Sequence, residues 1–232
     1  MEWSEFLTAL RKALRKRKWR NKGWLEVVWE TLVHWLKPKV RGAVGERVLE
    51  GRLKLALRGS GAVVYGPFML RRGDGAGTSE VDGLVIARTG VFVIEAKTYK
   101  GAVEGRAEDE NWVQVLGRSR REFQNPLRQN YGHMKDVKRV LGKELAGEVH
   151  GVVAFSGEAE FRGTRPVQVM DFGDVAGYVK GFRRGRGLTE GEVAEAKAKM
   201  DAAIAEVTPE EKKRHVARLK EMRAQRAQGK RR

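Results

Sequence analysis

The sequence predicts an α/β protein in which helices flank a mixed central sheet, with helical N- and C-terminal extensions. The first observation is the order of the expected elements, which runs helix, strand, hairpin, helix, strand. The second is that residues 80–88 and 91–97 are apolar on both faces, as in strands covered by helices on both sides. The third is the length of 232 residues, which allows one sizeable domain with extensions but not two full domains.

Two helices are expected ahead of the central domain. Residues 3–19 repeat apolar side chains at intervals of three and four, which is typical of an amphipathic helix. A second helix is expected over residues 24–36 and should end at Pro38. Five of the six tryptophans lie in the first 35 residues. This segment should therefore dock on the protein's own body, on a protein partner or second copy in a homo-oligomer, or on a membrane surface.

The central elements follow in a clear order. Asn125 and Pro126 supply a helix start, and Gly142 supplies its end. Thr189 and Thr208 each precede a glutamate by three residues, which is the pattern of a capping box at the start of a helix. The expected central elements are helices over 43–57 and 125–141, and strands over 62–65, 80–88, 91–97, 102–104, 112–115, 151–155 and 166–170.

The net charge of +17 is concentrated in two terminal arms. Residues 1–42 hold 11 Lys and Arg against four Glu, and residues 211–232 hold 10 against two, so the middle of the chain is almost neutral. Basic arms suit nucleic-acid phosphates, although either arm alone could be a solvated helix. We expect a basic, Trp-rich helical N-terminal extension (1–42), a central domain (43–185) and a helical basic C-terminal extension (186–232).

The sequence contains no segment typical of secretion or membrane insertion. The most apolar run, residues 23–36, is interrupted by charged side chains and is shorter than the roughly 20 apolar residues that cross a bilayer. The first twenty residues lack the continuous apolar core of a secretory signal. The sequence therefore predicts a cytoplasmic protein.

The residue types present limit the chemistry of any site. There are no cysteines and only four histidines, which are scattered along the chain. Disulfides, thiol catalysis, cysteine-ligated zinc and a histidine-rich metal site are therefore not expected. A metal would be held mainly by oxygen ligands, which Mg²⁺ and Mn²⁺ prefer.

Asp82, Glu95 and Lys97 interrupt the two apolar strands of the expected hairpin. A turn at residues 88–89 makes Asp82 face Glu95, whereas a turn at residues 89–90, where the turn signal lies, makes Asp82 face Lys97. Either register places all three side chains on one face, because side chains alternate with a period of two. Such neighbours lie roughly 5–8 Å apart, close enough for two carboxylates to share a divalent cation. A structural ion pair between the lysine and one carboxylate is the alternative.

A resemblance to a known family rests on residues 77–101, which contain this trio, together with flanking motifs. The flanking motifs are Gly45-Glu46 upstream and Trp112 and Asn125-Pro126-Leu127-x-Gln129 downstream. In this order they resemble the nuclease-related domain (NERD) family of the PD-(D/E)xK restriction-endonuclease-like superfamily. The likeness covers about residues 43–155 and implies a restriction-endonuclease-like sheet. The leading proline of the superfamily signature is replaced by Val81.

The resemblance implies a role for each matching residue. Asp82 and Glu95 would ligate Mg²⁺ or Mn²⁺, and Glu46 would reach the site as an outer metal ligand. Lys97 would orient or help to deprotonate the attacking water, or stabilise charge on the scissile phosphate. Gln129 would complete the site from its helix.

The position of Gln129 is open on the sequence alone. The expected apolar stripe of its helix lies on the side away from Gln129 and His133, so both could face solvent. Glu80 is read as a solvated residue at a strand end, with an extra carboxylate of the site as the alternative. Trp112 is read as a core residue, with a base-stacking platform as the alternative. The residues expected to contact nucleic acid are Lys100, His133, Arg15, Lys16, Arg17, Lys18, Lys212, Lys213 and Arg214.

The function predicted first is that of a Mg²⁺- or Mn²⁺-dependent nuclease, an endo- or exodeoxyribonuclease that hydrolyses phosphodiester bonds of nucleic acid, with DNA as the expected substrate. One alternative is a nucleic-acid-binding module that is active only within a larger assembly. The other is a scaffold with an inactive nuclease fold, anchored to a membrane or partner by its Trp-rich N-terminus. The presence of Asp82, Glu95 and Lys97 favours the first.

Overall fold

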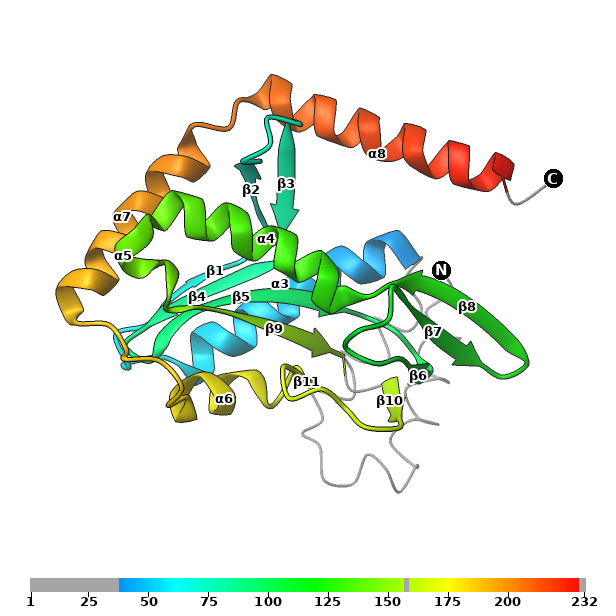
Figure 1. Cartoon of the computed structure of the whole chain (residues 1–232), viewed down its shortest axis with the longest axis horizontal. Coiled ribbons are helices and arrows are strands. Elements are labelled where there is room, and N and C mark those ends of the chain that lie inside the picture. The colour runs from blue at the N-terminus through cyan, green and yellow to red at the C-terminus, as the bar shows by residue number, and fades with distance from the viewer. Residues whose placement is uncertain (1–37, 157–158, 230–232) are drawn as a thin grey trace, which may run out of the picture. The chain divides into compact units, whose positions relative to one another are not determined.

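The computed structural model describes residues 38–156 and 159–229 of the chain (Figure 1). The helices expected over residues 3–19 and 24–36 lie outside the described residues. The chain divides into two units, Met1–Gly45 and Glu46–Arg232, and the sheets, cores and cleft described below belong to the second. In the described part of the chain, no helix is long and apolar enough to cross a membrane.

A five-stranded mixed sheet lies at the centre of this unit, as predicted. Its strand order is β1-β4-β5-β9-β11. β1 pairs antiparallel with β4 and β4 with β5, whereas β5 with β9 and β9 with β11 are parallel. These strands are β1 (Val63–Tyr65), β4 (Gly83–Ala87), β5 (Gly90–Lys97), β9 (Val149–Phe155) and β11 (Val169–Asp171).

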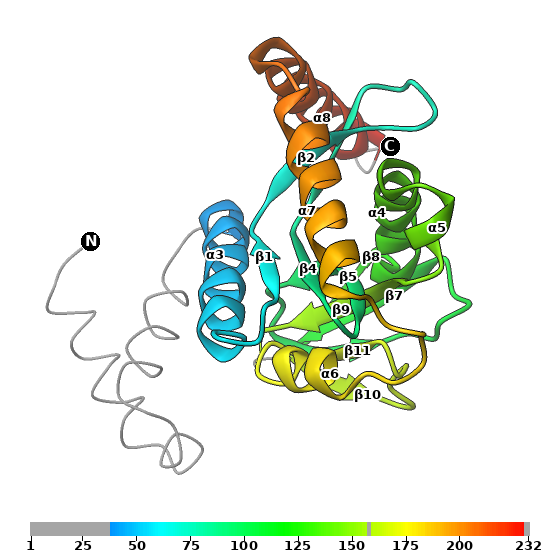
Figure 2. The ribbon, with the colours of Figure 1, turned by 90° about the vertical axis from the view of Figure 1, so that its left-hand side faces the viewer.

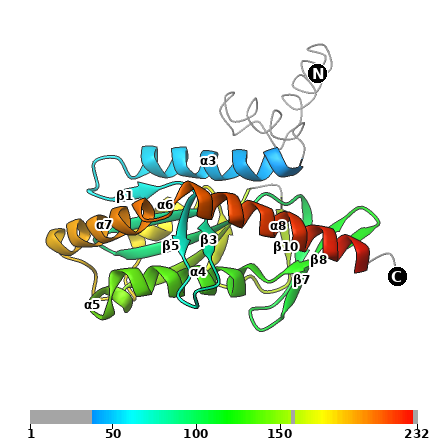
Figure 3. The same cartoon turned by 90° about the horizontal axis from the view of Figure 1, so that it is seen from above.

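Helices cover both faces of this sheet, as the doubly apolar strands predict (Figures 2 and 3). On one face, α4 (Pro126–Leu141) and α7 (Glu190–Ala205) pack on a core that includes Leu84 and Val93. On the other face, α3 (Pro38–Ala56), from Glu46 onward, and α6 (Val175–Gly181) pack on a core that includes Phe92. The other helices are α5 (Lys143–Ala146) and α8 (Pro209–Gly229).

Two smaller sheets flank the central one. Strands β6 (Gly101–Glu104), β7 (Asn111–Leu116), β8 (Ser119–Gln124) and β10 (Ala159–Arg162) form a four-stranded sheet in the order β10-β6-β7-β8. The pairing of residues 102–104 with 113–115 confirms the predicted short pair. Strands β2 (Phe68–Arg71) and β3 (Thr78–Val81) form a two-stranded sheet. Strands β2, β8 and β10 were not predicted, because none of them has a clear alternating apolar pattern.

The predicted strand 80–88 is broken at Asp82. Ala87 pairs with Gly90, so the hairpin turn lies at residues 88–89 and not at the turn signal of residues 89–90. Asp82 is a bend between β3 and β4. Val81 therefore packs with Leu84 in the core under α4, whereas an unbroken strand would place it in the opposite core. The bend releases Asp82 from the strand pairing and leaves its carboxylate free to turn back onto β5.

The start of α3 also differs from the prediction. Pro38 is the first residue of this helix, so the helix starts before the expected residue Ala43. Proline suits the first turn of a helix because it lacks an N–H group that would have no helical acceptor there.

Asn125 begins α4 as predicted, and its side chain is fully buried. Its Oδ1 accepts a hydrogen bond from the backbone N of Leu127 at 2.9 Å. Its Nδ2 donates to the carbonyl oxygens of Arg106, Ala107 and Asp109. The side chain thus fixes the start of the helix against the loop that follows β6.

We expect Asn125→Ala to lower the free energy of unfolding by about 2 kcal/mol, the upper end of the range for helix caps. The reason is that the change removes the cap and also removes the hydrogen bonds from the buried side chain to the loop carbonyl oxygens of Ala107 and Asp109. Urea denaturation measures the loss, with Asn111→Ala at an exposed position of β7 as the matched control. Equal stability of the two variants would contradict this account of the helix start.

Candidate active site

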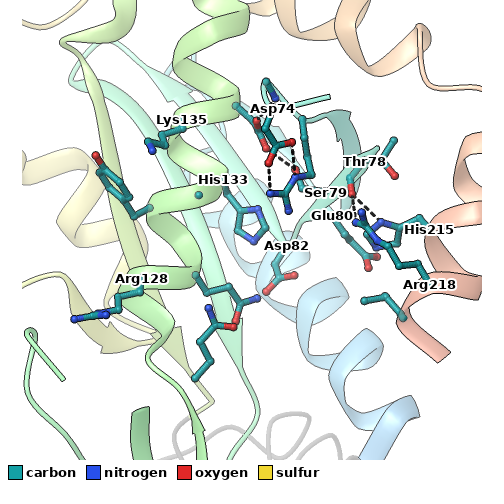
Figure 4. A pocket seen from close by; sticks show the side chains of 18 of the residues that line it. Asp74, Thr78, Ser79, Glu80, Asp82, Arg128, His133, Lys135, His215 and Arg218 are labelled. Carbon is teal, nitrogen blue, oxygen red and sulfur yellow. Dashed lines mark hydrogen bonds and ion pairs between the residues drawn. The ribbon is translucent and has the colours of Figure 1, made fainter. Parts of the chain in front are cut away.

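Asp82, Glu95 and Lys97 meet at the carboxyl end of β5. Glu95 and Lys97 are two residues apart on that strand, so their side chains lie on the same face, the one covered by α4. Asp82 reaches the same place from the bend, where its Oδ2 accepts a hydrogen bond from the backbone N of Ala96 at 2.8 Å. Asp82 and His133 both point into a cleft (Figure 4). The structure therefore brings the predicted trio together on one face.

Lys97 connects the strand to the helix above it. Its Nζ donates to Glu95 Oε1 at 2.5 Å and to Gln129 Oε1 at 3.0 Å. The side chain of Glu95 is 1% exposed and that of Lys97 is 15% exposed. Gln129 therefore faces the site, and the alternative in which it points into solvent is not what the structure has.

The orientation of α4 differs from the one that its apolar pattern predicts. The predicted stripe would bury Tyr131, yet this side chain is 58% exposed. Asn130 is buried instead, and its Nδ2 donates to the carbonyl oxygens of Val93 and Val152 at 2.9 and 3.0 Å. A hydrophobic pattern could not identify this polar contact between α4 and the central sheet. The side chain of His133, also expected at the surface, is only 12% exposed.

The carboxylates of the site repel one another. Burial, and then the charges of Glu95 and Glu46, raise the pKa of Asp82 well above its ordinary value. Burial also raises the pKa of Glu46, and the charges of Glu80 and Glu95 add to the effect. Glu46 of α3 is thus electrostatically coupled to the site, as expected of an outer member.

Glu95 and Lys97 stabilise each other's charged forms. Burial alone would raise the pKa of Glu95, but the Lys97 ammonium and His133 outweigh it and lower that pKa. Burial alone would lower the pKa of Lys97, but Glu95 and then Asp82 raise it. Lys97 is therefore an ammonium at neutral pH, and it faces two carboxyl groups, Glu95 and Asp82.

The free oxygen atoms of the site suit a hard divalent cation. Glu95 Oε2 is buried and has no hydrogen-bond partner among the described residues. The hydrogen bond from Ala96 engages Oδ2 of Asp82 and leaves Oδ1 available. Mg²⁺ is commonly held by one or two carboxylates together with water. Within residues 38–156 and 159–229, no three His, Asp or Glu side chains form a ready-made metal group, so the fit rests on this pair of carboxylates.

A cleft of about 860 Å³ opens onto Asp82. One wall is α4, and the other is formed by β3 and α8. His215 docks α8 on β3, because its Nδ1 lies 2.9 Å from the carbonyl oxygen of Thr78. The Lys and Arg side chains that line the cleft are Arg72, Arg128, Lys135 and Arg218. No sequence signal pointed to His215 or Arg218, since their place depends on how the last helix folds back over the chain.

Asp136 of α4 ties the two walls of the cleft together. Its Oδ2 accepts a hydrogen bond from Ser79 Oγ at 2.7 Å, and its Oδ1 accepts one from the backbone N of Gly73 at 3.0 Å. Asp136 and Ser79 are both buried. The wall built on the two-stranded sheet is therefore held to α4 by side-chain contacts.

The other residues singled out in the sequence lie farther from the trio. Glu80 is exposed and lines the cleft, and Trp112 is fully buried in the core as predicted. Lys100 is half-buried beyond the end of β5. The expected nucleic-acid contacts Lys212, Lys213 and Arg214 are exposed on α8. The expected contacts Arg15, Lys16, Arg17 and Lys18 lie outside the described residues.

Comparison with known proteins adds a family and one relative. The family model described as the nuclease-related domain matches residues 41–156, which include the trio, Glu46, Gln129 and His133 but not α7 or α8. An uncharacterized protein of Bacillus anthracis is 35% identical over 109 residues, a match that covers 47% of this chain and 50% of the relative. The match thus spans about half of the relative's length. No solved structure matches the chain significantly.

Proposed function

Because the chain belongs to the nuclease-related domain family, we propose that it is a metal-dependent nuclease that hydrolyses phosphodiester bonds of nucleic acid, in the first place DNA. The observation that carries the proposal is the pair of carboxylates, the buried Glu95 and the half-buried Asp82, beside the Lys97 ammonium, with Asp82 lining a cleft. Charges of one sign are not usually buried together unless a ligand compensates them. Active sites are where such perturbed groups gather.

Asp82 and Glu95 would hold Mg²⁺ or Mn²⁺, with Glu46 as an outer carboxylate. When bound, the ion would neutralise charge on the scissile phosphate and increase the acidity of a water molecule. Lys97 keeps its proton at neutral pH because its pKa is raised. Its part is therefore to stabilise negative charge on the phosphate oxygens, not to accept a proton. Gln129 holds the ammonium in place through its Oε1.

In this proposal, the C-terminal helix binds the phosphate backbone of the nucleic acid. The net charge of the chain resides mainly in its two terminal arms, and α8, which carries most of the C-terminal arm, lines the cleft through Arg218. Lysine and arginine side chains attract phosphates over several ångströms and release bound counterions. The arm would thus place a strand across the cleft that leads to Asp82.

The direct test is cleavage of supercoiled plasmid and of single-stranded, duplex and RNA oligonucleotides in Mg²⁺ or Mn²⁺, with EDTA as the metal-free condition. We expect nicking that needs the metal and that Glu95→Gln abolishes. Glu144→Gln, at an exposed glutamate of α5, is the matched control and should cleave normally. Binding of DNA without metal-dependent cleavage by the wild type would refute the nuclease and favour a binding module of a larger assembly.

The proposed binding of the phosphate backbone by α8 leads to a separate prediction about DNA affinity. Replacing Lys212, Lys213 and Arg214 by alanine should weaken binding to DNA in EDTA and flatten its dependence on salt, by about 0.9 in the log–log slope for each phosphate that the variant no longer neutralises. The matched control removes three exposed cations elsewhere, Lys143, Lys180 and Arg184. Fluorescence anisotropy over a salt series measures both slopes. The same slope in the two triple variants would show that net charge alone, and not α8, governs binding.

A further inference from the structure

The outer side of α4 carries an exposed aromatic ring. Tyr131 is 58% exposed, and among the residues that the structure describes it is the only exposed Phe, Tyr or Trp side chain. A single exposed apolar side chain is common on protein surfaces and by itself needs no explanation. This ring, however, lines the same cleft as Asp82. Its place therefore bears on what the cleft binds.

Two cations flank the ring on α4. Arg128 and Lys135 lie three residues before and four residues after Tyr131, so the three side chains share one face of the helix. Lys135 Nζ lies 5.2 Å from the centre of the ring, and Arg128 donates to a backbone carbonyl oxygen. Neither cation forms an ion pair with a carboxylate in the described part of the chain. The one carboxylate of α4, Asp136, is buried and bound to Ser79, so the charge of this face is not neutralised.

One explanation of this cluster is a local contact that stabilises the helix. Side chains four residues apart meet on a helix, and a cation over an aromatic ring is weakly favourable. That contact occupies only one face of the ring, and with 58% of the side chain exposed the other face stays open. An open aromatic ring beside uncompensated cations is the arrangement on which the bases of single-stranded nucleic acids stack.

A route connects this face of α4 with the carboxylates. Arg128 and Lys135 project on the side of the helix away from Asp82 (Figure 4). Between the two sides lies Gly132, which is exposed and has no side chain to form a ridge across the helix. Asp82, Gly132 and Tyr131 all line the cleft. A strand of several nucleotides can therefore pass from the carboxylates over α4 to the ring.

We propose that Tyr131 is a stacking platform for a base of single-stranded nucleic acid, with Arg128 and Lys135 beside it to bind the phosphates. The substrate of the site is then a single strand, or a single-stranded segment of a longer molecule. The inference rests on the proposed nuclease function and names its substrate class. In a duplex, the bases are paired and only their edges are open in the grooves. A side chain can stack on a base only where the strand is unpaired.

Fluorescence anisotropy in EDTA, with a labelled single-stranded oligodeoxynucleotide and with the duplex of the same sequence, tests the platform. Tyr131→Ala should weaken binding of the single strand roughly 5- to 150-fold, the fold-change that corresponds to one stacked base, and should change duplex binding much less. Tyr131→Phe keeps the ring and should bind as the wild type does. The matched control is Leu55→Ala, which removes a 75% exposed apolar side chain from α3 and should also leave binding unchanged.

Three results would overturn the proposal. They are an unchanged affinity of Tyr131→Ala for the single strand, an equal loss for the single strand and the duplex, and a loss in Tyr131→Phe as large as in Tyr131→Ala. The last would assign the interaction to the hydroxyl group and not to the ring. Binding in EDTA is separate from the nicking assay. Selective binding of single strands through Tyr131 without metal-dependent cleavage would refute the nuclease alone.

Discussion

Replacing Asp82 by asparagine is expected to stabilise the metal-free protein and to abolish its nuclease activity. Asparagine keeps an oxygen that can accept the hydrogen bond from the backbone N of Ala96, but it removes a charge that Glu95 and Glu46 repel. We expect a gain of about 1–2 kcal/mol in the free energy of unfolding, the usual size of such relief. Cleavage should fall more than about 100-fold, because even residues that support a metal ligand contribute 10- to 100-fold.

The gain in stability should depend on pH in a defined direction. A carboxyl group whose pKa is raised by folding adds stability below its unfolded pKa of about 4, and that stability is lost as the pH rises through the folded pKa. The raised pKa of Asp82 therefore makes its charge a cost at neutral pH. The advantage of Asp82→Asn over the wild type should be largest at pH 7 and above and should shrink as the pH falls toward 4.

Thermal denaturation at several pH values, with EDTA or with Mn²⁺, measures both effects. Mn²⁺ should raise the Tm of the wild type and not that of Asp82→Asn, because a ligand stabilises only the state that binds it. A variant that is less stable than the wild type in EDTA at pH 7 would contradict the charge repulsion described for this site. A variant that still nicks plasmid would contradict the metal role of Asp82.

Removing Lys97 is expected to have the opposite effect on stability. Lys97→Met leaves the carboxylate of Glu95, which is 1% exposed, without its partner. Removing one member of a buried ion pair typically costs about 3–5 kcal/mol. The double change Glu95→Gln/Lys97→Met removes both charges and should restore most of the loss, while neither variant should cleave nucleic acid.

The matched control is an ion pair of the same length at the surface. Lys197 Nζ lies 2.5 Å from Asp201 Oδ2, with both side chains about half exposed. Lys197→Met should change stability little, because solvent screens exposed pairs. Urea denaturation at pH 7 in EDTA measures all the variants. A small loss for Lys97→Met, or no recovery in the double variant, would show that the buried pair does not hold the site together.

The central sheet and the shared face of the trio could be predicted from the sequence for a simple physical reason. Side chains alternate along strands, so the placement of Asp82, Glu95 and Lys97 did not depend on which of two turns the hairpin uses. Strands with two apolar faces also required helices on both sides of the sheet. Both inferences depend only on the pattern of side chains within one or two neighbouring strands, and not on contacts between distant parts of the chain.

The rest depends on contacts that sequence patterns do not contain. The bend at Asp82 is fixed by a hydrogen bond to β5, and the rotation of α4 by Asn130, a polar residue whose burial no apolar pattern indicates. The highly charged β8 has no strand pattern. The place of α8 over the cleft depends on His215, which lies 137 residues from its partner Thr78 in the chain.

The contact between Asp136 and Ser79 has a consequence for how this protein can change over evolution. The carboxylate pair and Lys97 lie on or beside the five-stranded sheet, whereas the second wall of the cleft is built on a separate two-stranded sheet. One aspartate sets the spacing of the walls by accepting hydrogen bonds from Ser79 and Gly73. Because β3 ends at Val81, directly before Asp82, a substitution at this tie is expected to act on the width of the entrance and on the placement of Asp82 together. Access to the cleft and the position of one carboxylate would therefore evolve jointly.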